Sequence, residues 1–329
     1  MNKTIFIEDI TAGATGVEEI FSVKEIQKHT AKNGDPYFRV VLQDKTGTIQ
    51  GKIWKDAIAL TKAETLAVGD VIKIDFEASE YNGNLQMTIR RAEKTTEYDA
   101  GDLMKVSEKD LEAMYAKLLE FLESLKDADI KRVVLTMAKD PELSKRLKTA
   151  IAGELVHHDY IGGLLEHTLE MMSIAETILR LYPRANRSIV MGGIFLHDLG
   201  KIEELGMDNT TFFRTLPGYL IGHITLGMQL LQRFIPPAFP QEKKLALEHI
   251  ILSHHRELEF GAVVKPATLE AIIVSMCDLS SSVVRQFQKE LDEGKSDESG
   301  FGGYHKYMKN RIYHKEIIEQ ETETEPVDS

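Results

Sequence analysis

The sequence predicts a two-domain protein, in which an all-β domain is followed by an all-α helical bundle. Residues 1–98 contain short runs of β-branched and aromatic residues separated by turn residues, which is typical of β-strands. From residue 106 onward, apolar residues recur at spacings of three and four, the pattern of amphipathic helices. Between the two patterns, residues 95–101 are polar and mark the domain boundary. We therefore expect domains at 1–98 and 99–315, followed by an acidic, solvated tail at 316–329.

The composition is that of an ordinary globular protein. The chain has 329 residues, of which 43% are hydrophobic and 28% are charged, and its formal net charge is −12. Its first residues lack the apolar core of a signal peptide, and no apolar run reaches the length of a membrane span, so we expect a cytoplasmic protein. The single cysteine, Cys277, excludes an intrachain disulfide and a cysteine-based zinc site. A metal in this chain would have to be held by histidine and carboxylate.

The N-terminal domain contains five predicted strands. They cover residues 19–27, 37–43, 47–54, 71–79 and 85–93. Turns rich in Asn, Gly and Asp separate several of them, and the segment 55–66 favours a short helix. Five strands with a helix between the third and the fourth is the order of an OB-fold barrel. Such barrels commonly bind single-stranded nucleic acid by stacking bases on exposed aromatic rings.

Aromatic and basic residues of these strands are the candidates for a nucleic-acid-binding face. The set comprises Tyr37, Phe38, Trp54 and Tyr81 as aromatic residues, with Lys24, Arg39, Lys52 and Arg90 as cations. Because side chains alternate along a strand, Tyr37 and Phe38 point to opposite faces, and at least one of them is expected in the core. Trp54, at a strand end, is compatible with either the core or the stacking face.

The helical domain carries a distinctive polar signal at residues 191–201, where an apolar run leads into His197, Asp198 and Gly200. A run that is apolar on every side is typical of a helix buried inside a bundle, and the glycine is expected to end it. An imidazole and a carboxylate side by side at the end of a buried helix can converge on one cation. The alternative is a plain helix end with a hydrogen-bonded buried histidine.

Four further polar residues lie on the apolar stripes of other predicted helices. They are His167, His223, His254 and Asp278. No cationic residue shares these stripes, so the carboxylates have no obvious partner there. Since burying ionised groups without partners is prohibitively costly, five helices that each direct a His or Asp inward indicate a metal site rather than isolated core residues.

The order His, His-Asp, His, His, Asp resembles that of the HD-domain phosphohydrolase superfamily. That resemblance implies a first metal held by His167, His197, Asp198 and Asp278. It also implies a second metal held by His223 and His254, with Asp198 bridging the two. The helical bundle is accordingly expected to be an HD domain.

A closer resemblance covers nearly the whole chain. The strings HHDYIGGLLEHTLEM, GHITLG, SHHRELEFG and GYHKYMKNRIYH, together with an OB-fold in front of them, look like those of the YhaM-type 3′→5′ exoribonucleases of bacteria. Two positions depart from that family's pattern: Arg256 stands where glycine is common, and Ser281 where an aspartate is common. Neither is expected to bind metal.

The resemblance implies a metal-dependent 3′→5′ exonuclease that hydrolyses single-stranded RNA to mononucleotides. Single-stranded DNA is left open as a second substrate, as is a homo-oligomeric state. Two divalent cations are expected; the resemblance favours manganese, and iron, cobalt or zinc is also compatible with these ligands. Because the expected ligands lie on the inward stripes of their helices, we also expect the active site to be a pocket. A pocket accepts the end of a nucleic-acid strand more readily than the middle of the strand.

Asp198 and Lys201 are the expected catalytic residues; Lys201 lies just past the His-Asp pair and could reach a phosphate oxygen. An equally weighted alternative makes Lys201 a solvated lysine at a helix C-terminus. The residues expected to contact the terminal nucleotide are His157, His158, Tyr160, His255 and Arg256.

Two other functions fit part of the pattern. A nucleotide phosphohydrolase or cyclic-nucleotide phosphodiesterase with an HD domain would use the same ligands, but it has no evident need of an OB-fold. A non-catalytic nucleic-acid-binding adaptor would need the OB-fold, but not the second set of metal-binding histidines. The exonuclease hypothesis is the one that uses both domains.

Overall fold

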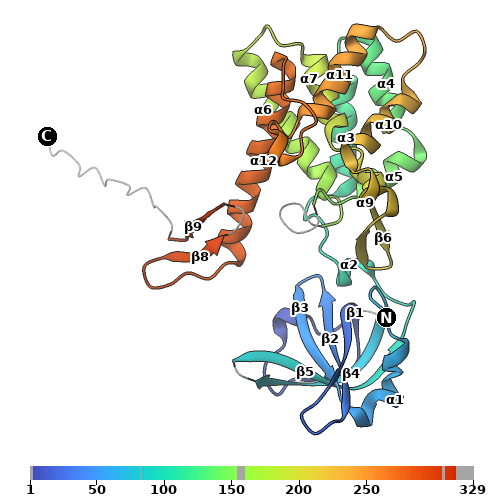
Figure 1. The fold of residues 1–329 in the computed structure, drawn as a ribbon, viewed down its shortest axis with the longest axis vertical. Coiled ribbons are helices and arrows are strands. Elements are labelled where there is room, and N and C mark those ends of the chain that lie inside the picture. Colours follow the sequence, from blue (N-terminus) through green and yellow to red (C-terminus); the bar gives the residue numbers. More distant parts are fainter. Residues whose placement is uncertain (1–2, 82, 154–159, 306–307, 316–329) are drawn as a thin grey trace, which may run out of the picture.

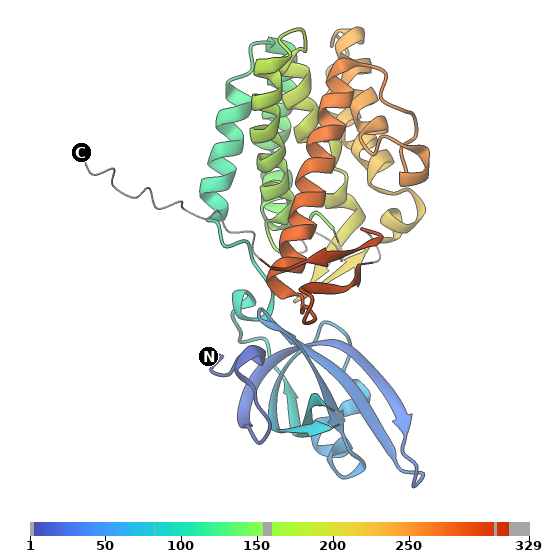
Figure 2. The ribbon, with the colours of Figure 1, turned by 90° about the vertical axis from the view of Figure 1, so that its left-hand side faces the viewer.

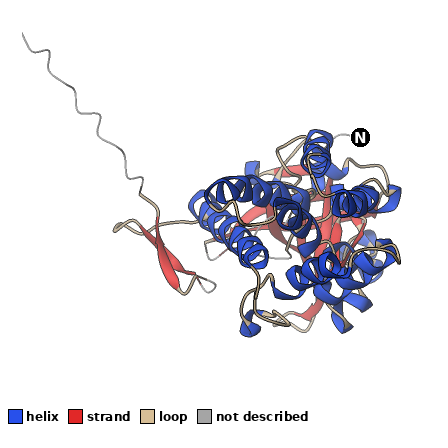
Figure 3. Ribbon diagram, turned by 90° about the horizontal axis from the view of Figure 1, so that it is seen from above, coloured by secondary structure: helices blue, strands red, loops and turns tan. Residues whose placement is uncertain are grey.

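The computed structural model describes residues 3–81, 83–153, 160–305 and 308–315. A β-barrel lies at one end of the molecule and a helical bundle at the other (Figure 1). Seen from above, the helices lie over the strands of the barrel (Figure 3). In the described part of the chain, no helix combines the length and the apolar character that crossing a membrane requires.

Five strands close the barrel. They are β1 (Thr15–Thr30), β2 (Pro36–Asp44), β3 (Gly47–Ile53), β4 (Val71–Tyr81) and β5 (Asn84–Lys94), in the order β1-β2-β3-β5-β4. The long strand β1 pairs antiparallel with β4 through residues 15–22 and with β2 through residues 22–30. Its register with β2 shifts between Val23 and Glu25. Strands β3 and β5 run parallel and close the barrel. This is the OB-fold order, so the predicted fold of the N-terminal domain is confirmed.

The segment between β3 and β4 differs from the single helix that the sequence favours. It forms three short turns, η2 (Lys55–Ala57), α1 (Ile58–Thr61) and η3 (Ala63–Thr65). Lys62 ends α1 because its φ of 48° lies in the left-handed region, where a right-handed helix cannot continue.

The helical domain begins after a short helix, α2 (Ala100–Leu103), that lies against the barrel. Its helices are α3 (Leu111–Glu123), α4 (Ala128–Ala138), α5 (Pro141–Thr149), α6 (Gly163–Leu181), α7 (Arg187–His197), α8 (Lys201–Glu204), α9 (Leu216–Leu220), α10 (His223–Phe234), α11 (Gln241–Ser253) and α12 (Leu269–Glu293). Side-chain caps set several of the starts: Asp110, Asp127 and Asp140 each accept a hydrogen bond from a backbone N–H in the first turn.

Helix α7 lies in the middle of the bundle, as the apolar run predicts. Two glycines let its neighbours approach closely. A Cβ at Gly193 would lie 2.5 Å from Cδ1 of Ile250 on α11, and one at Gly192 would lie 2.9 Å from Cγ2 of Ile130 on α4. Any side chain at these positions would push the surrounding helices away from the end of α7, where His197 lies.

Two hairpins correct the expectation that everything after residue 106 is helical. Strands β6 (Leu205–Asp208) and β7 (Thr211–Arg214) form one, and β8 (Phe301–His305) and β9 (Asn310–Tyr313) form the other. Asn209 makes the first turn with a φ of 49°, which asparagine tolerates better than most residues. Strands of four or five residues are too short for their periodicity to be recognised. The second hairpin follows the long helix α12 (Figure 2).

The two domains meet through α2 and the first hairpin. Leu103 is fully buried in a small cluster with Ile20 and Val71 of the barrel. The hydroxyls of Ser22 on β1 and Thr210 in the β6–β7 turn also contact each other. The linker that the sequence predicts as polar therefore ends in an apolar anchor on the barrel.

Candidate metal centre and nucleic-acid face

The six residues expected to bind metal converge on one interior site, as the inward stripes predict. His167 comes from α6, His197 ends α7, and Asp198 follows it directly. The remaining three come from other helices: His223 begins α10, His254 follows α11, and Asp278 lies within α12. His167, His197 and His254 are at most 1% exposed, so the centre is a buried one.

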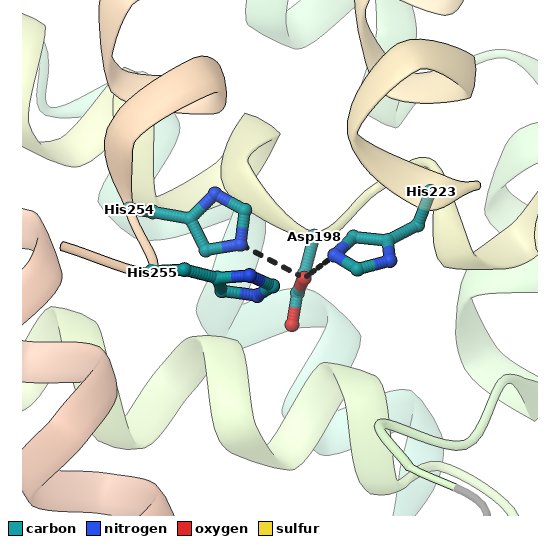
Figure 4. A group of neighbouring side chains, drawn as sticks. All are labelled: Asp198, His223, His254 and His255. Carbon is teal, nitrogen blue, oxygen red and sulfur yellow. Dashed lines mark ion pairs between the residues drawn. The ribbon is translucent and has the colours of Figure 1, made fainter. Parts of the chain in front are cut away.

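Within the described residues, these side chains form two groups with the spacing of metal ligands. One group contains His167, His197 and Asp278, and the other contains Asp198, His223, His254 and His255. In each group the ligand atoms all lie within 4.8 Å of one another. Figure 4 shows the second group, with the imidazoles directed at Asp198.

Asp198 lies between the two groups. Its Oδ1 is 3.6 Å from Nε2 of His223 and 3.5 Å from Nε2 of His254 (Figure 4). Its Oδ2 is 3.4 Å from Nε2 of His197, which belongs to the first group. A carboxylate that faces histidines of both groups has the position of a bridging ligand.

Hydrogen bonds to the Nδ1 atoms orient three of the imidazoles. Nδ1 of His197 lies 2.7 Å from the carbonyl oxygen of Ile194, and Nδ1 of His254 lies 2.8 Å from that of Ile251. Nδ1 of His223 lies 3.3 Å from a carboxylate oxygen of Glu204. Since these oxygens only accept, the ring proton belongs on Nδ1 and the lone pair on Nε2, as metal-binding histidines require.

The buried atoms that face the centre fit a cation. Among the residues that the structure describes, none donates or accepts a hydrogen bond at Nε2 of His197, His223 or His254, or at Oδ1 of Asp198. Leaving such atoms buried and unsatisfied is costly. A divalent cation would satisfy several of them at once, because imidazole nitrogens and carboxylate oxygens are its common ligands.

The charge states also suit a metal. Burial lowers the pKa of His167 and of His254, so both are neutral near pH 7. Burial also opposes ionisation of Asp198, but Lys201 and His197 hold the pKa of that carboxyl well below its ordinary value. His197 is the exception: burial there is outweighed by the Asp198 carboxylate, which raises the pKa of that imidazole, so a cation bound there would displace a proton. Neutral imidazoles and ionised carboxylates are the forms that bind cations.

Lys201 lies against Asp198 rather than in solvent. Its Nζ donates to Oδ2 of Asp198 at 2.6 Å and to the carbonyl oxygen of Ala152 at 2.5 Å. The alternative of a solvated lysine at a helix C-terminus is therefore wrong: Lys201 begins α8, and its side chain is only 14% exposed. The lysine neutralises and orients the carboxylate that faces both groups.

The residues expected to contact substrate lie in different environments, and two of them are outside the described part of the chain. His157 and His158 lie outside the described residues. Tyr160 donates its hydroxyl hydrogen to Glu166 at 2.9 Å. His255, expected to contact substrate, instead lies within the second ligand group. Burial and the neighbouring His254 lower the pKa of the His255 imidazole to about 4. The sequence offered a weak signal for this role, since His255 directly follows a residue expected to bind metal.

The barrel carries an aromatic group on its surface. The rings of Tyr37 and Trp54 lie 5.2 Å apart, and the Lys52 ammonium lies 5.5 Å from the Trp54 ring and 5.3 Å from the Tyr81 ring. Trp54 is 39% and Tyr81 60% exposed. A hollow of about 730 Å³ borders Trp54. Exposed rings beside a cation suit single-stranded nucleic acid.

Three other barrel residues change the sequence-based picture. Phe38 is buried in the barrel core, which corrects its assignment to the stacking face; alternation along β2 leaves Tyr37 as the outward ring. Arg90 is ion-paired with Glu77 of β4 at 2.8 Å. His29, which sequence reasoning missed, stacks on Tyr37 with ring centres 5.5 Å apart, because the β1–β2 register places the two residues opposite each other.

Comparisons with known proteins agree with this architecture. Residues 164–281 match the HD domain, and residues 19–95 match the OB-fold nucleic acid binding domain. The 3′-5′ exoribonuclease YhaM of Listeria welshimeri is 30% identical over 295 residues, which cover 88% of this chain and 92% of the relative. The chain belongs to the YhaM family. YhaM proteins of Listeria monocytogenes and of a Geobacillus species are 29% and 28% identical, over 94% and 92% of this chain and 98% and 92% of those relatives.

The structure also places the two residues at which the sequence was expected to depart from the family pattern, Arg256 and Ser281. Arg256 has a φ of 67°, in the left-handed region, which glycine adopts more readily than other residues. Ser281 is buried on α12 with its hydroxyl 3.0 Å from Nδ1 of His167. Ser281 therefore contacts a candidate metal ligand.

Proposed function

We propose that this chain is a metal-dependent 3′→5′ exoribonuclease that degrades single-stranded RNA to mononucleotides. The observation that carries the proposal is the pair of ligand groups facing Asp198, in a chain that also has an OB-fold barrel. The relatives named above are 3′-5′ exoribonucleases, which supplies the direction and the preference for RNA. Single-stranded DNA is a second candidate substrate.

Two divalent cations complete the centre in this proposal. His167, His197, Asp198 and Asp278 hold the first, and His223 and His254 hold the second together with Asp198. We include His255 as a further candidate, because its ring lies in the second ligand group. When bound, two such cations activate water and neutralise the charge that develops on a phosphoryl group. Manganese is the metal we favour from the family resemblance; iron, cobalt or zinc is compatible with the same ligands.

The protein's own side chains prepare the site. Asp198 faces histidines of both groups, and Lys201 keeps it ionised and oriented; the Lys201 ammonium would also meet a phosphate oxygen brought to the centre. Tyr160 and Arg256, with His157 and His158, are the proposed contacts to the terminal nucleotide. We assign hydrolysis to a domain at residues 99–315 and RNA binding to the barrel at residues 1–98. Residues 316–329 form the acidic tail in this proposal, and we place the protein in the cytoplasm.

The barrel is what separates this proposal from a cyclic-nucleotide phosphodiesterase. A mononucleotide substrate would use the metal centre alone, whereas an RNA strand can be held on Tyr37, Trp54 and Lys52 while its end enters the buried centre. Because the ligands are buried, a free end reaches them more easily than an internal phosphodiester. The reaction should therefore be exonucleolytic.

The test compares a 5′-labelled linear single-stranded RNA that has a free 3′ hydroxyl with a circular RNA of the same sequence, both with Mn²⁺. We expect a ladder that shortens from the 3′ end, mononucleotide products and an intact circle. Rapid cleavage of the circle would show an endonuclease. Hydrolysis of cyclic nucleotides with no action on the linear strand would favour the phosphodiesterase. A parallel DNA strand settles the sugar preference.

A further inference from the structure

His167 differs from the other buried imidazoles in what meets its Nδ1 atom. His197 ends α7 and His254 follows α11, so each ring can reach a carbonyl oxygen three residues earlier in the last turn. His167 lies within α6, where the carbonyl oxygens of the preceding turn accept helical hydrogen bonds. Its Nδ1 instead lies 3.0 Å from the hydroxyl oxygen of Ser281 on α12.

A hydroxyl is an ambiguous partner for a histidine, because it can donate or accept. The structure removes the ambiguity at Ser281. Its Oγ–H donates to Oε2 of Glu170 at 2.8 Å, and an ionised carboxylate can only accept. The single hydroxyl proton is thereby committed, and Oγ is left to accept from Nδ1–H of His167.

Glu170 is itself held as an anion. The guanidinium of Arg285 on α12 contacts its other carboxylate oxygen, Oε1, and also reaches Glu166 at 3.1 Å. Ser281 is 4% exposed, so water does not readily replace it as the acceptor for the imidazole. Reversing the Ser281 hydroxyl toward Nδ1 would place its lone pairs against the Glu170 carboxylate, which is unfavourable in a buried site.

We propose that Ser281 and Glu170 act as a positioning pair that holds the ring proton of His167 on Nδ1. Nε2 of His167 and Oδ1 of Asp278, 3.3 Å apart, are then both left as acceptors, which a shared cation would satisfy. The inference rests on the proposed metal centre, because it assigns the pair the task of presenting Nε2 to a cation.

The experiment uses the full chain with ¹⁵N-labelled histidine, in wild type, Ser281→Ala, Ser281→Thr and Ser280→Ala. Ser280→Ala is the matched control, since the Ser280 hydroxyl donates to the Met276 carbonyl of its own helix. With the diamagnetic probe Zn²⁺ bound, NMR of wild type should show a downfield, slowly exchanging Nδ1–H for His167. Calorimetry with Mn²⁺ should resolve the two sites.

In Ser281→Ala the Nδ1–H signal should move upfield and exchange faster, and one of the two Mn²⁺ sites should weaken about 10- to 100-fold. Ser281→Thr should restore both properties, and Ser280→Ala should change neither. An unchanged Nδ1–H signal and unchanged Mn²⁺ affinity in Ser281→Ala would overturn the positioning role. If Ser281→Ala fails to fold, a wild-type Nδ1–H that is absent or exchanges freely would overturn it.

These readouts also separate this inference from the proposed function. Neither requires RNA, so a chain that binds two cations and shows the Ser281 effects but leaves RNA intact would refute only the exoribonuclease. A wild-type chain that binds no cation would overturn both. A chain that degrades RNA but shows no effect of Ser281→Ala would refute only the positioning pair.

Discussion

Replacing Asp198 by asparagine tests the centre most directly, because the change removes one charge and keeps the shape of the side chain. In the metal-free protein, Asp198 and Lys201 form a 2.6 Å ion pair whose side chains are only 5% and 14% exposed. Removing one partner of a buried pair typically costs about 3–5 kcal/mol. Lys201 keeps a second acceptor, the Ala152 carbonyl, so we expect the lower end, about 3 kcal/mol.

The loss can be measured by urea unfolding of metal-free protein, followed by the helical circular dichroism signal. That signal reports on the bundle, whereas fluorescence of Trp54, the single tryptophan, reports on the barrel. Asp208→Asn is the matched control, since Asp208 is an exposed carboxylate in the β6–β7 hairpin. The control should change the free energy of unfolding by less than about 0.5 kcal/mol.

The second half of the test measures how much bound Mn²⁺ stabilises the folded protein. Mn²⁺ at a hundred times its dissociation constant should stabilise the wild type by about 2.7 kcal/mol per site. Asp198→Asn should lose most of this gain at both sites, because Asp198 faces both ligand groups, and it should abolish RNA hydrolysis. A variant within about 1 kcal/mol of the wild type without metal, or one that keeps two Mn²⁺ sites, would refute the bridging assignment.

Three further predictions concern the barrel, the backbone and the pH dependence. Trp54→Ala should weaken binding of a single-stranded oligoribonucleotide by about 1–3 kcal/mol in a fluorescence-anisotropy titration with labelled RNA, whereas Tyr182→Ala, at an exposed aromatic residue of the bundle, should have no effect. Arg256→Gly should raise the free energy of unfolding by about 0.5–1 kcal/mol, because it relieves a left-handed backbone; a loss of stability would show that the arginine's contacts matter more. At Asp278, burial would raise the pKa, but contact with the His167 imidazole outweighs burial and depresses the folded value. This carboxylate therefore contributes stability above the unfolded pKa of about 4 that is lost as the pH falls further, so in acid titrations Asp278→Asn should flatten the decline seen in metal-free wild type.

Much of the fold follows from local patterns that the chain carries along its length. Alternation and turn residues placed all five strands of the barrel, because a strand with one buried face must repeat every two residues. Helical periodicity likewise put His167 and Asp278 on inward faces, where a polar group needs a partner. The short hairpins escaped prediction, since four or five residues contain too little of any period to distinguish a strand.

The tertiary structure decided which of these inward groups face one another. Periodicity gives the direction of a side chain from its own helix, but distances between helices depend on how they pack and which rotamers the packing allows. Only the packed bundle shows His255 in the second ligand group, Lys201 paired with Asp198, and Ser281 between His167 and Glu170. The sequence alone determined that buried histidines and carboxylates need a common partner. The distances that divide them into two groups depend on how closely the helices pack, for example at Gly193 against Ile250, which local periodicity does not encode.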